Sequence, residues 1–185
     1  MNEADFQFSR GDYNRALNAC INVLTLNNNN DYAYFLRGAS YARLGIHHQA
    51  INEFSSAIEI NPNNAQYYTW RAASLTQRYI YDEANADFTK ALALNPNDPF
   101  CYMKRGQNYQ AQHMHKEAVA DFDKALSIPG SNYFAYYYKG ISYDELGLKQ
   151  QALESYKLFL QNAHKNLKTR YSSYAEDRIN DLSNN

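Results

Sequence analysis

The amino-acid sequence predicts an all-α fold, a right-handed superhelical solenoid of antiparallel helix pairs that ends in a C-terminal capping helix. The main observation is that small and aromatic residues recur at a fixed interval of 34 positions (72 − 38 and 88 − 54 both give 34). A period of this length is typical of stacked helix pairs. The three ladders are Gly38, Ala72, Gly106 and Gly140; Ala50, Ala84, Ala118 and Ala152; and Phe54, Phe88, Phe122 and Tyr156.

Each repeat reads as two helices. With Asp31 as position 1, the apolar or small residues at positions 4, 8 and 11 share one face of a first helix, helix A. Those at positions 20, 24 and 27 share one face of a second helix, helix B. Small residues at positions 8 and 20 let the two backbones approach closely. The predicted repeats are residues 31–64, 65–98, 99–132 and 133–166.

Glycine and proline mark the ends of these helices. Gly45 and Gly147 lie between helix A and helix B, where a helix C-terminus favours a left-handed residue, and Gly11 occupies the same place one period earlier. Pro62 and Pro96 end helix B in two successive repeats. These positions agree with the helix boundaries that the apolar pattern predicts.

The two ends of the chain depart from the full repeat. Residues 1–30 form a partial repeat in which helix A is cut to residues 3–9 and Asp12-Tyr13 opens helix B. The segment 167–185 lies beyond the period, and its helix, expected over 167–183, should cap the last repeat within one overall domain. The apolar stripe of this helix consists of Leu167, Tyr171, Tyr174, Ala175, Ile179 and Leu182.

The pattern resembles the tetratricopeptide repeat (TPR), whose signature has an aromatic residue, a small residue and Tyr, followed by Ala, an aromatic residue, Ala and Pro. The segment from Phe88 through Ala91 to Pro96 is a close match, and the resemblance covers about residues 1–166. It implies a scaffold for protein partners. Some family members hold the C-terminal carboxylates of chaperone tails, but this chain lacks that clamp because Phe35, Ala39 and Trp70 occupy its positions.

Composition excludes several classes of partner. The net charge is −1, which gives no electrostatic reason to bind nucleic acid or an anionic membrane. No apolar run approaches the roughly 18 residues of a membrane span, and the N-terminus lacks the features of a signal peptide. Cys20 and Cys101 fall on different elements of non-adjacent repeats, so they are expected to stay reduced in a cytoplasmic protein.

The face of helix A opposite positions 4, 8 and 11 carries aromatic residues that stacking does not require. Exposed aromatic patches usually mark interaction surfaces. We therefore predict a concave groove that binds an extended or helical peptide with apolar anchors. The alternative is that some of these side chains pack against the neighbouring helix A and belong to the core. The predicted groove residues are Tyr32, Phe35, Leu36, Thr69, Trp70, Phe100, Met103, Lys104, Gln107, Phe134, Tyr137, Tyr138 and Ile141.

Other chemistry finds little support. Position 7 is basic in every complete repeat, and position 23 is acidic in three of the four. This pattern predicts a ladder of structural ion pairs, and the alternative is a row of residues that binds anions. The residues at position 7 are Arg37, Arg71, Arg105 and Lys139, and those at position 23 are Glu53, Asp87, Asp121 and Ser155. The pairs His47-His48 and His113/His115 lie two repeats apart, roughly 20 Å, so they cannot share one metal ion. No catalytic cluster or cofactor motif is recognisable, and no enzyme activity, metal or cofactor is expected.

The leading functional hypothesis is therefore a non-catalytic adaptor that binds a protein or peptide partner. The alternative is a self-assembling protein that forms a weak homo-oligomer. In that hypothesis the truncated first helix A leaves core residues exposed, and the N-terminal repeat or the groove serves as the interface between copies.

Overall fold

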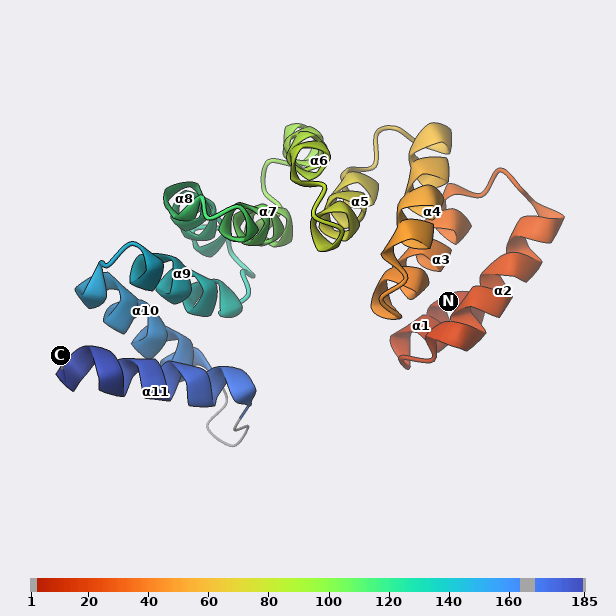
Figure 1. The fold of residues 1–185 in the computed structure, drawn as a ribbon. Coiled ribbons are helices and arrows are strands. Elements are labelled where there is room, and N and C mark those ends of the chain that lie inside the picture. Colours follow the sequence, from red (N-terminus) through yellow and green to blue (C-terminus); the bar gives the residue numbers. More distant parts are fainter. Residues whose placement is uncertain (1–2, 164–168, 185) are drawn as a thin grey trace. The chain divides into compact units, whose positions relative to one another are not determined.

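The computed structural model describes residues 3–163 and 169–184, which form helices and connecting turns (Figure 1). Ten of the eleven helices in these residues pack as sequential pairs, and the eleventh follows alone, which confirms the all-helical repeat fold. Their bounds are α1 (Glu3–Ser9), α2 (Tyr13–Leu26), α3 (Asp31–Arg43), α4 (His47–Ile60), α5 (Ala65–Gln77), α6 (Tyr81–Leu94), α7 (Pro99–Ala111), α8 (His115–Leu126), α9 (Phe134–Glu145), α10 (Lys149–Asn162) and α11 (Arg170–Asn184).

The helices divide into two compact units, Met1–Pro96 and Asn97–Asn185. The first unit holds the pairs α1–α2, α3–α4 and α5–α6. The second unit holds α7–α8 and α9–α10, and α11 packs on α10. Each pair corresponds to helix A followed by helix B of a predicted repeat.

Small residues at position 8 allow the two helices of a pair to approach closely. At Gly106 a Cβ atom would lie 2.6 Å from a ring carbon of Phe122, and at Gly140 it would lie 2.7 Å from the ring of Tyr156. The alanines at position 20 are fully buried in the four complete pairs: Ala50, Ala84, Ala118 and Ala152. The small-residue ladders therefore mark where helix B presses its aromatic side chain onto helix A.

Left-handed residues occupy the turn between the two helices of each pair. Gly45 and Gly147 have φ of 78° and 70°, as predicted. Tyr79 and His113 adopt the same conformation, with φ of 63° and 58°, at the same repeat position (79 − 45 = 34 and 113 − 79 = 34). Side chains other than glycine are strained in this region, so residue type alone does not predict these two turns.

Polar residues cap four helices of the first and second units. Asn30 accepts a hydrogen bond from the backbone N–H of Ala33, so the asparagine run before α3 supplies its cap. The other three caps are Asp12 on α2, Asn64 on α5 and Asp98 on α7. Apolar residues precede the helix B members instead, namely Ile46, Ile80, Met114 and Leu148.

The terminal helix α11 covers the last pair, as predicted. Its apolar side chains Tyr171, Ile179 and Leu182 pack around a core that includes Ala175, Tyr156 and Phe159. Arg178 anchors the helix through Asp144 of α9, with Nε 2.7 Å from Oδ2. The helix begins at Arg170, and Leu167 of the predicted stripe lies outside the described residues.

Candidate functional site

Five predicted groove residues are buried, so the expectation that they face solvent is wrong. Position 5 is buried in all four complete pairs. The two aromatic residues at this position, Phe35 and Tyr137, each contact helix B of their own repeat and one further helix. The Phe35 ring lies 5.9 Å from Phe54 and 5.1 Å from Tyr67, between centroids. Leu36 packs against Cys20. The exposed fractions are Phe35 5%, Leu36 3%, Thr69 1%, Met103 7% and Tyr137 8%.

Eight predicted residues do reach the surface. Tyr32 and Phe100 are exposed, with 43% and 40% of their surface accessible. The other six are half-buried and belong to helix A members of the two units: Trp70 of α5, Lys104 and Gln107 of α7, and Phe134, Tyr138 and Ile141 of α9.

In the first unit the surface residues are Tyr32 and Trp70. The Tyr32 hydroxyl donates to Asp5 Oδ1 at 2.5 Å, and burial together with this carboxylate raises the pKa of Tyr32 to about 12. Trp70 stands edge-on to Phe35, and the Arg43 guanidinium lies 5.4 Å from the Trp70 ring centroid. Through this cation–π contact, the Trp70 ring and the Arg43 guanidinium form a surface that presents both apolar and cationic groups.

In the second unit the surface residues form a connected aromatic and basic patch. The Lys104 ammonium lies 5.4 Å from the Phe100 ring centroid and donates to Gln107 Oε1 at 3.1 Å. The Tyr138 ring stacks on Phe122, with centroids 6.0 Å apart. These residues come from α7, α8 and α9, which hold the patch on a packed core.

The terminal helix α11 extends this patch with two residues that the sequence interpretation missed. The Arg170 Nη2 atom donates to the Tyr171 hydroxyl at 2.9 Å. Burial raises the pKa of Tyr138, and Tyr171 raises it further, whereas Gln107 and Arg170 lower it; all three therefore lie close to Tyr138. The 34-residue period reaches Tyr171 (137 + 34 = 171), but the apolar stripe of this helix predicts only a capping role. We call the patch of Phe100, Lys104, Gln107, Tyr138, Arg170 and Tyr171 the aromatic face.

The ion-pair ladder is confirmed at three of its four steps. Arg37 Nη2 lies 2.7 Å from Glu53 Oε2, and each of the next two arginines forms two hydrogen bonds with its aspartate: Arg71 with Asp87 and Arg105 with Asp121. The fourth step differs, because Lys139 Nζ pairs with Asp123 at 2.5 Å, whereas the Ser155 hydroxyl donates to the Gln151 carbonyl. Because each basic residue at position 7 is paired with a carboxylate, these residues do not require a bound anion.

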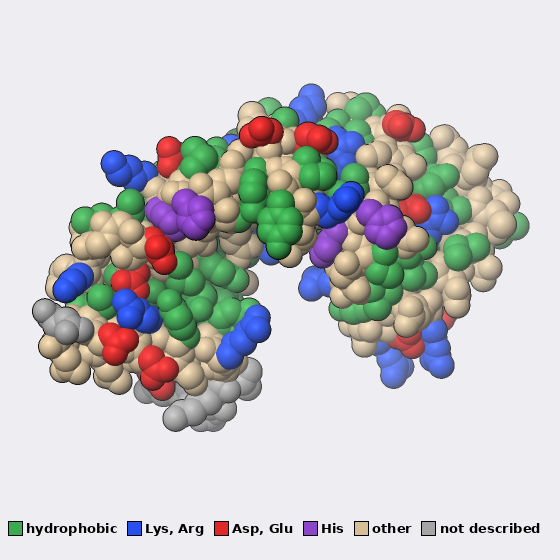
Figure 2. Space-filling model, in the orientation of Figure 1, with side chains coloured by type: hydrophobic (Ala, Val, Ile, Leu, Met, Phe, Trp, Pro, Cys, Tyr) green, Lys and Arg blue, Asp and Glu red, His purple; other side chains and the backbone are tan. Residues whose placement is uncertain are grey.

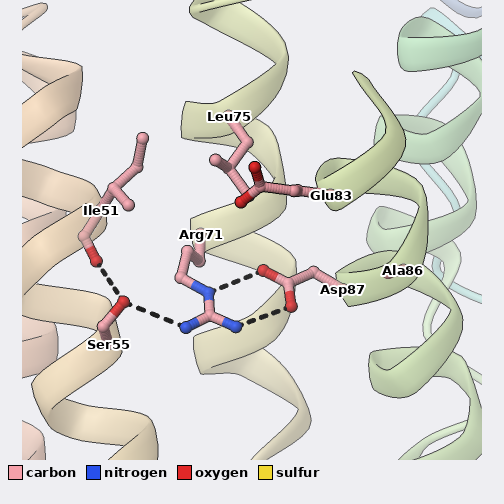
Figure 3. Close-up of a pocket in the computed structure, with 7 residues that line it drawn as sticks. All are labelled: Ile51, Ser55, Arg71, Leu75, Glu83, Ala86 and Asp87. Atoms are coloured by element: carbon pink, nitrogen blue, oxygen red, sulfur yellow. Dashed lines mark hydrogen bonds and ion pairs between the residues drawn. The ribbon is translucent and has the colours of Figure 1, made fainter. Parts of the chain in front are cut away.

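A slot of about 270 Å³ opens beside this ladder in the first unit (Figure 3). It lies between α4 and α6, with α5 behind it. Arg71 crosses the slot and donates through Nη1 to the Ser55 hydroxyl at 3.0 Å, and Ser55 in turn donates to the Ile51 carbonyl. The lining residues are Ile51, Ser55, Arg71, Leu75, Glu83, Ala86 and Asp87. The sequence interpretation did not identify this slot.

Comparison with known families identifies the repeat. Models described as tetratricopeptide repeat match residues 31–64, 101–132 and 134–163. The chain is a tetratricopeptide repeat protein. TPR repeats mediate protein and peptide binding and are typically non-catalytic. No curated protein matches this TPR protein in sequence.

Solved structures share its fold. The TPR protein is 25% identical to MamA, with a TM-score of 0.74 over 87% of this chain and 94% of that one. It is 18% identical to a thermophilic TPR protein of Thermus thermophilus, with a TM-score of 0.80 over 95% of each chain. It is also 20% identical to YrrB, described as a TPR protein with an unusual peptide-binding site, with a TM-score of 0.70 over 94% of this chain and 88% of that one.

Three features bear on other chemistries. Within residues 3–163 and 169–184 of the TPR protein, no three His, Cys, Asp or Glu side chains converge as a metal site, and the rings of His113 and His115 lie 5.9 Å apart. Across the same residues, no helix is long and apolar enough to cross a membrane. Cys20 and Cys101 are buried thiols, and burial raises the pKa of Cys20 to about 11.

Proposed function

We propose that this TPR protein is a non-catalytic adaptor that binds an extended peptide of a partner protein, with the aromatic face of the second unit as its anchoring site. The observation that carries the proposal is the exposure of Phe100, 40% accessible beside the half-buried Tyr138 and Tyr171. Clustered aromatic surface is a common feature of protein interfaces. Figure 2 shows hydrophobic side chains gathered over α9 and α11 on the side in view.

The aromatic face offers both kinds of contact that a peptide needs. An apolar side chain of the peptide packs against the rings of Phe100 and Tyr138. Lys104 and Arg170 donate to carbonyl or carboxylate oxygens of the peptide, and the amide of Gln107 both donates and accepts. Because these side chains already rest on a packed core, little ordering entropy is lost when the peptide binds.

The predicted groove residues that are buried have a supporting role in this proposal and do not contact the peptide. Tyr137 supports the aromatic face from behind, since its ring centroid lies 5.3 Å from Tyr138 and 5.2 Å from Tyr171. Position 5 thus sets the shape of the surface without touching the peptide. In the first unit, Tyr32 and Trp70 supply a second aromatic surface for the same class of ligand.

The proposal is tested by selecting random displayed peptides against the full chain and measuring their affinities by fluorescence polarisation. Selected peptides should carry aromatic or aliphatic anchors, and Phe100→Asp should weaken binding by about tenfold or more, as expected when an interface anchor is lost. Leu148→Asp is the matched control, because Leu148 is also 40% exposed but lies in the turn before α10. Equal losses in the two variants, or peptides without apolar anchors, would contradict the proposal.

A second candidate function is self-assembly through the N-terminal end. Leu26 at the end of α2 is 91% exposed, and Phe6 of α1 and Ile21 of α2 are 44% and 43% exposed. The truncated α1 nevertheless covers part of the core, because Ala4, Cys20 and Leu36 are buried together. Light scattering across protein concentration separates the two functions: a constant monomer mass excludes self-assembly, and a mass that falls in Leu26→Lys supports it.

A further inference from the structure

The slot beside Arg71 is suited to a single side chain rather than to a small-molecule ligand. Its volume of about 270 Å³ lies below the roughly 300–1,000 Å³ of typical ligand pockets. Its walls include the aliphatic side chains of Ile51 and Leu75 and the methyl group of Ala86. A long flexible side chain from another protein can place its methylene groups against such walls.

The charged groups around the slot leave an excess of one negative charge. Arg71 is engaged by Asp87 through Nε at 2.7 Å and Nη2 at 2.8 Å, so their charges offset each other. Glu83 forms no ion pair among the described residues, and Figure 3 shows its carboxylate beside Leu75, facing the slot. Because Asp87 offsets the charge of Arg71, the Glu83 carboxylate would repel an anion and attract a cation.

The preceding helix pair of the same unit lacks this excess charge at the repeat-related positions. One period before Glu83 the chain carries Gln49 (83 − 34 = 49), and one period before Asp87 it carries Glu53, which is paired with Arg37. The repeat-related positions on α3 and α4 therefore carry no unpaired charge. Within the first unit the carboxylate of Glu83 has no counterpart at Gln49, whereas Glu117 repeats it in the second unit (83 + 34 = 117).

We propose that the slot binds a lysine or arginine side chain of a partner protein, with the methylene groups against Ile51 and Leu75 and the cationic head at Glu83. The slot is formed by α4, α5 and α6 and includes no residue of the aromatic face. It is a second binding site, independent of the proposed peptide site, and it would select partners that carry a basic residue.

The direct test is titration of the ¹⁵N-labelled full chain with N-acetyl-lysine methylamide, followed by amide chemical shifts. Shifts should concentrate at Ser55, Glu83 and Ala86 and saturate in the millimolar range expected for one contact of this size. N-acetyl-norleucine methylamide, which keeps the aliphatic chain and lacks the charge, should bind much more weakly. No localised shift at the solubility limit of the lysine ligand, or equal shifts with norleucine, overturns the proposal.

Three variants then separate the slot from general electrostatics. Glu83→Gln should weaken the lysine ligand by about three- to fivefold, as expected for an exposed ion pair, and its exposed helical position should leave the circular dichroism spectrum unchanged. Asp82→Asn removes the same charge one residue earlier, outside the lining, and should leave the affinity unchanged. Ala86→Leu keeps the charge but fills the slot, and should abolish binding. A loss in Asp82→Asn equal to that in Glu83→Gln, or full binding by Ala86→Leu, overturns the proposal.

Discussion

Arg71 and Asp87 lie 16 residues apart in sequence and are joined by two hydrogen bonds, from Nε to Oδ2 at 2.7 Å and from Nη2 to Oδ1 at 2.8 Å. The pair ties α5 to α6, and both side chains are largely removed from water, with 23% and 11% of their surface accessible. A bidentate pair in this setting is stronger than an exposed one because solvent screens it less.

Removing one partner of this pair should destabilise the protein. Arg71→Leu leaves the Asp87 carboxylate buried without its cation, and we expect a loss of about 2 kcal/mol, less than for a fully buried pair because some water reaches both groups. Urea unfolding followed by circular dichroism measures this. The double variant Arg71→Leu/Asp87→Leu should recover part of the loss; if it is as unstable as the sum of the two single variants, the pairing account is wrong.

A surface pair in the same unit provides the control. Arg15 lies 3.3 Å from Asp12, and the side chains are 73% and 40% exposed. Arg15→Ala should therefore change stability by less than about 0.5 kcal/mol.

The left-handed turns at Tyr79 and His113 predict two stabilising substitutions. Tyr79→Gly and His113→Gly relieve the clash of a side chain at φ of 63° and 58°, and each should raise the free energy of unfolding by about 0.5–1 kcal/mol after the greater chain entropy of glycine is subtracted. Tyr79 is 79% exposed, so little packing is lost. Gly45→Tyr should have the opposite effect, and a destabilised Tyr79→Gly would show that the tyrosine makes contacts that offset its strain.

The hydroxyl of Tyr156 is buried and forms no hydrogen bond of good geometry among the described residues, although the Tyr174 side chain lies close to it. The same repeat position carries phenylalanine in the three preceding pairs. Tyr156→Phe should therefore be neutral or stabilising by up to about 1 kcal/mol, whereas Phe122→Tyr should cost about 1–3 kcal/mol because it buries a new unpaired hydroxyl. Thermal or urea unfolding of the two variants gives the comparison, and a clear loss in Tyr156→Phe would contradict it.

The buried thiol of Cys20 predicts a pH dependence. Its pKa is raised to about 11 in the folded protein, above the value of about 8.5 for a free cysteine, so the folded state holds its proton where the unfolded state has lost it. Its stabilising contribution is complete below about pH 8 and is lost as the pH rises toward 11. Disulfide-exchange reagents at pH 8 should label Cys20 only after unfolding. Rapid labelling of the native protein would contradict the burial that raises the pKa of this thiol.

How far the sequence predicts this structure depends on whether a feature is periodic. The 34-residue ladders located the helix pairs because close packing at Gly106 or Ala118 must recur in every repeat. The prediction that position 5 faces solvent failed because it considered the faces of helix A alone, without the helices that pack around it. Phe35 and Tyr137 were expected opposite the packing face, yet each contacts helix B of its own repeat and also a second neighbouring helix.

The missed residues have equally specific causes. Tyr171 continues the period into α11, but the surrounding sequence no longer matches the repeat. The slot depends on the direction of the Arg71 side chain and on the spacing of three helices, neither of which a sequence pattern contains. Tyr79 and His113 stand where the turn geometry favours glycine, so only the backbone conformation reveals their common position.

The central claim, that the aromatic face binds a peptide, is tested most directly by site-specific photo-cross-linking. A benzoylphenylalanine introduced at Gln107 of the aromatic face should cross-link a selected peptide, whereas the same group at the exposed Glu59 of α4 should not. The account predicts cross-linked product at Gln107 that disappears in Phe100→Asp. Product at Glu59 alone, or at both sites to the same extent, would contradict it.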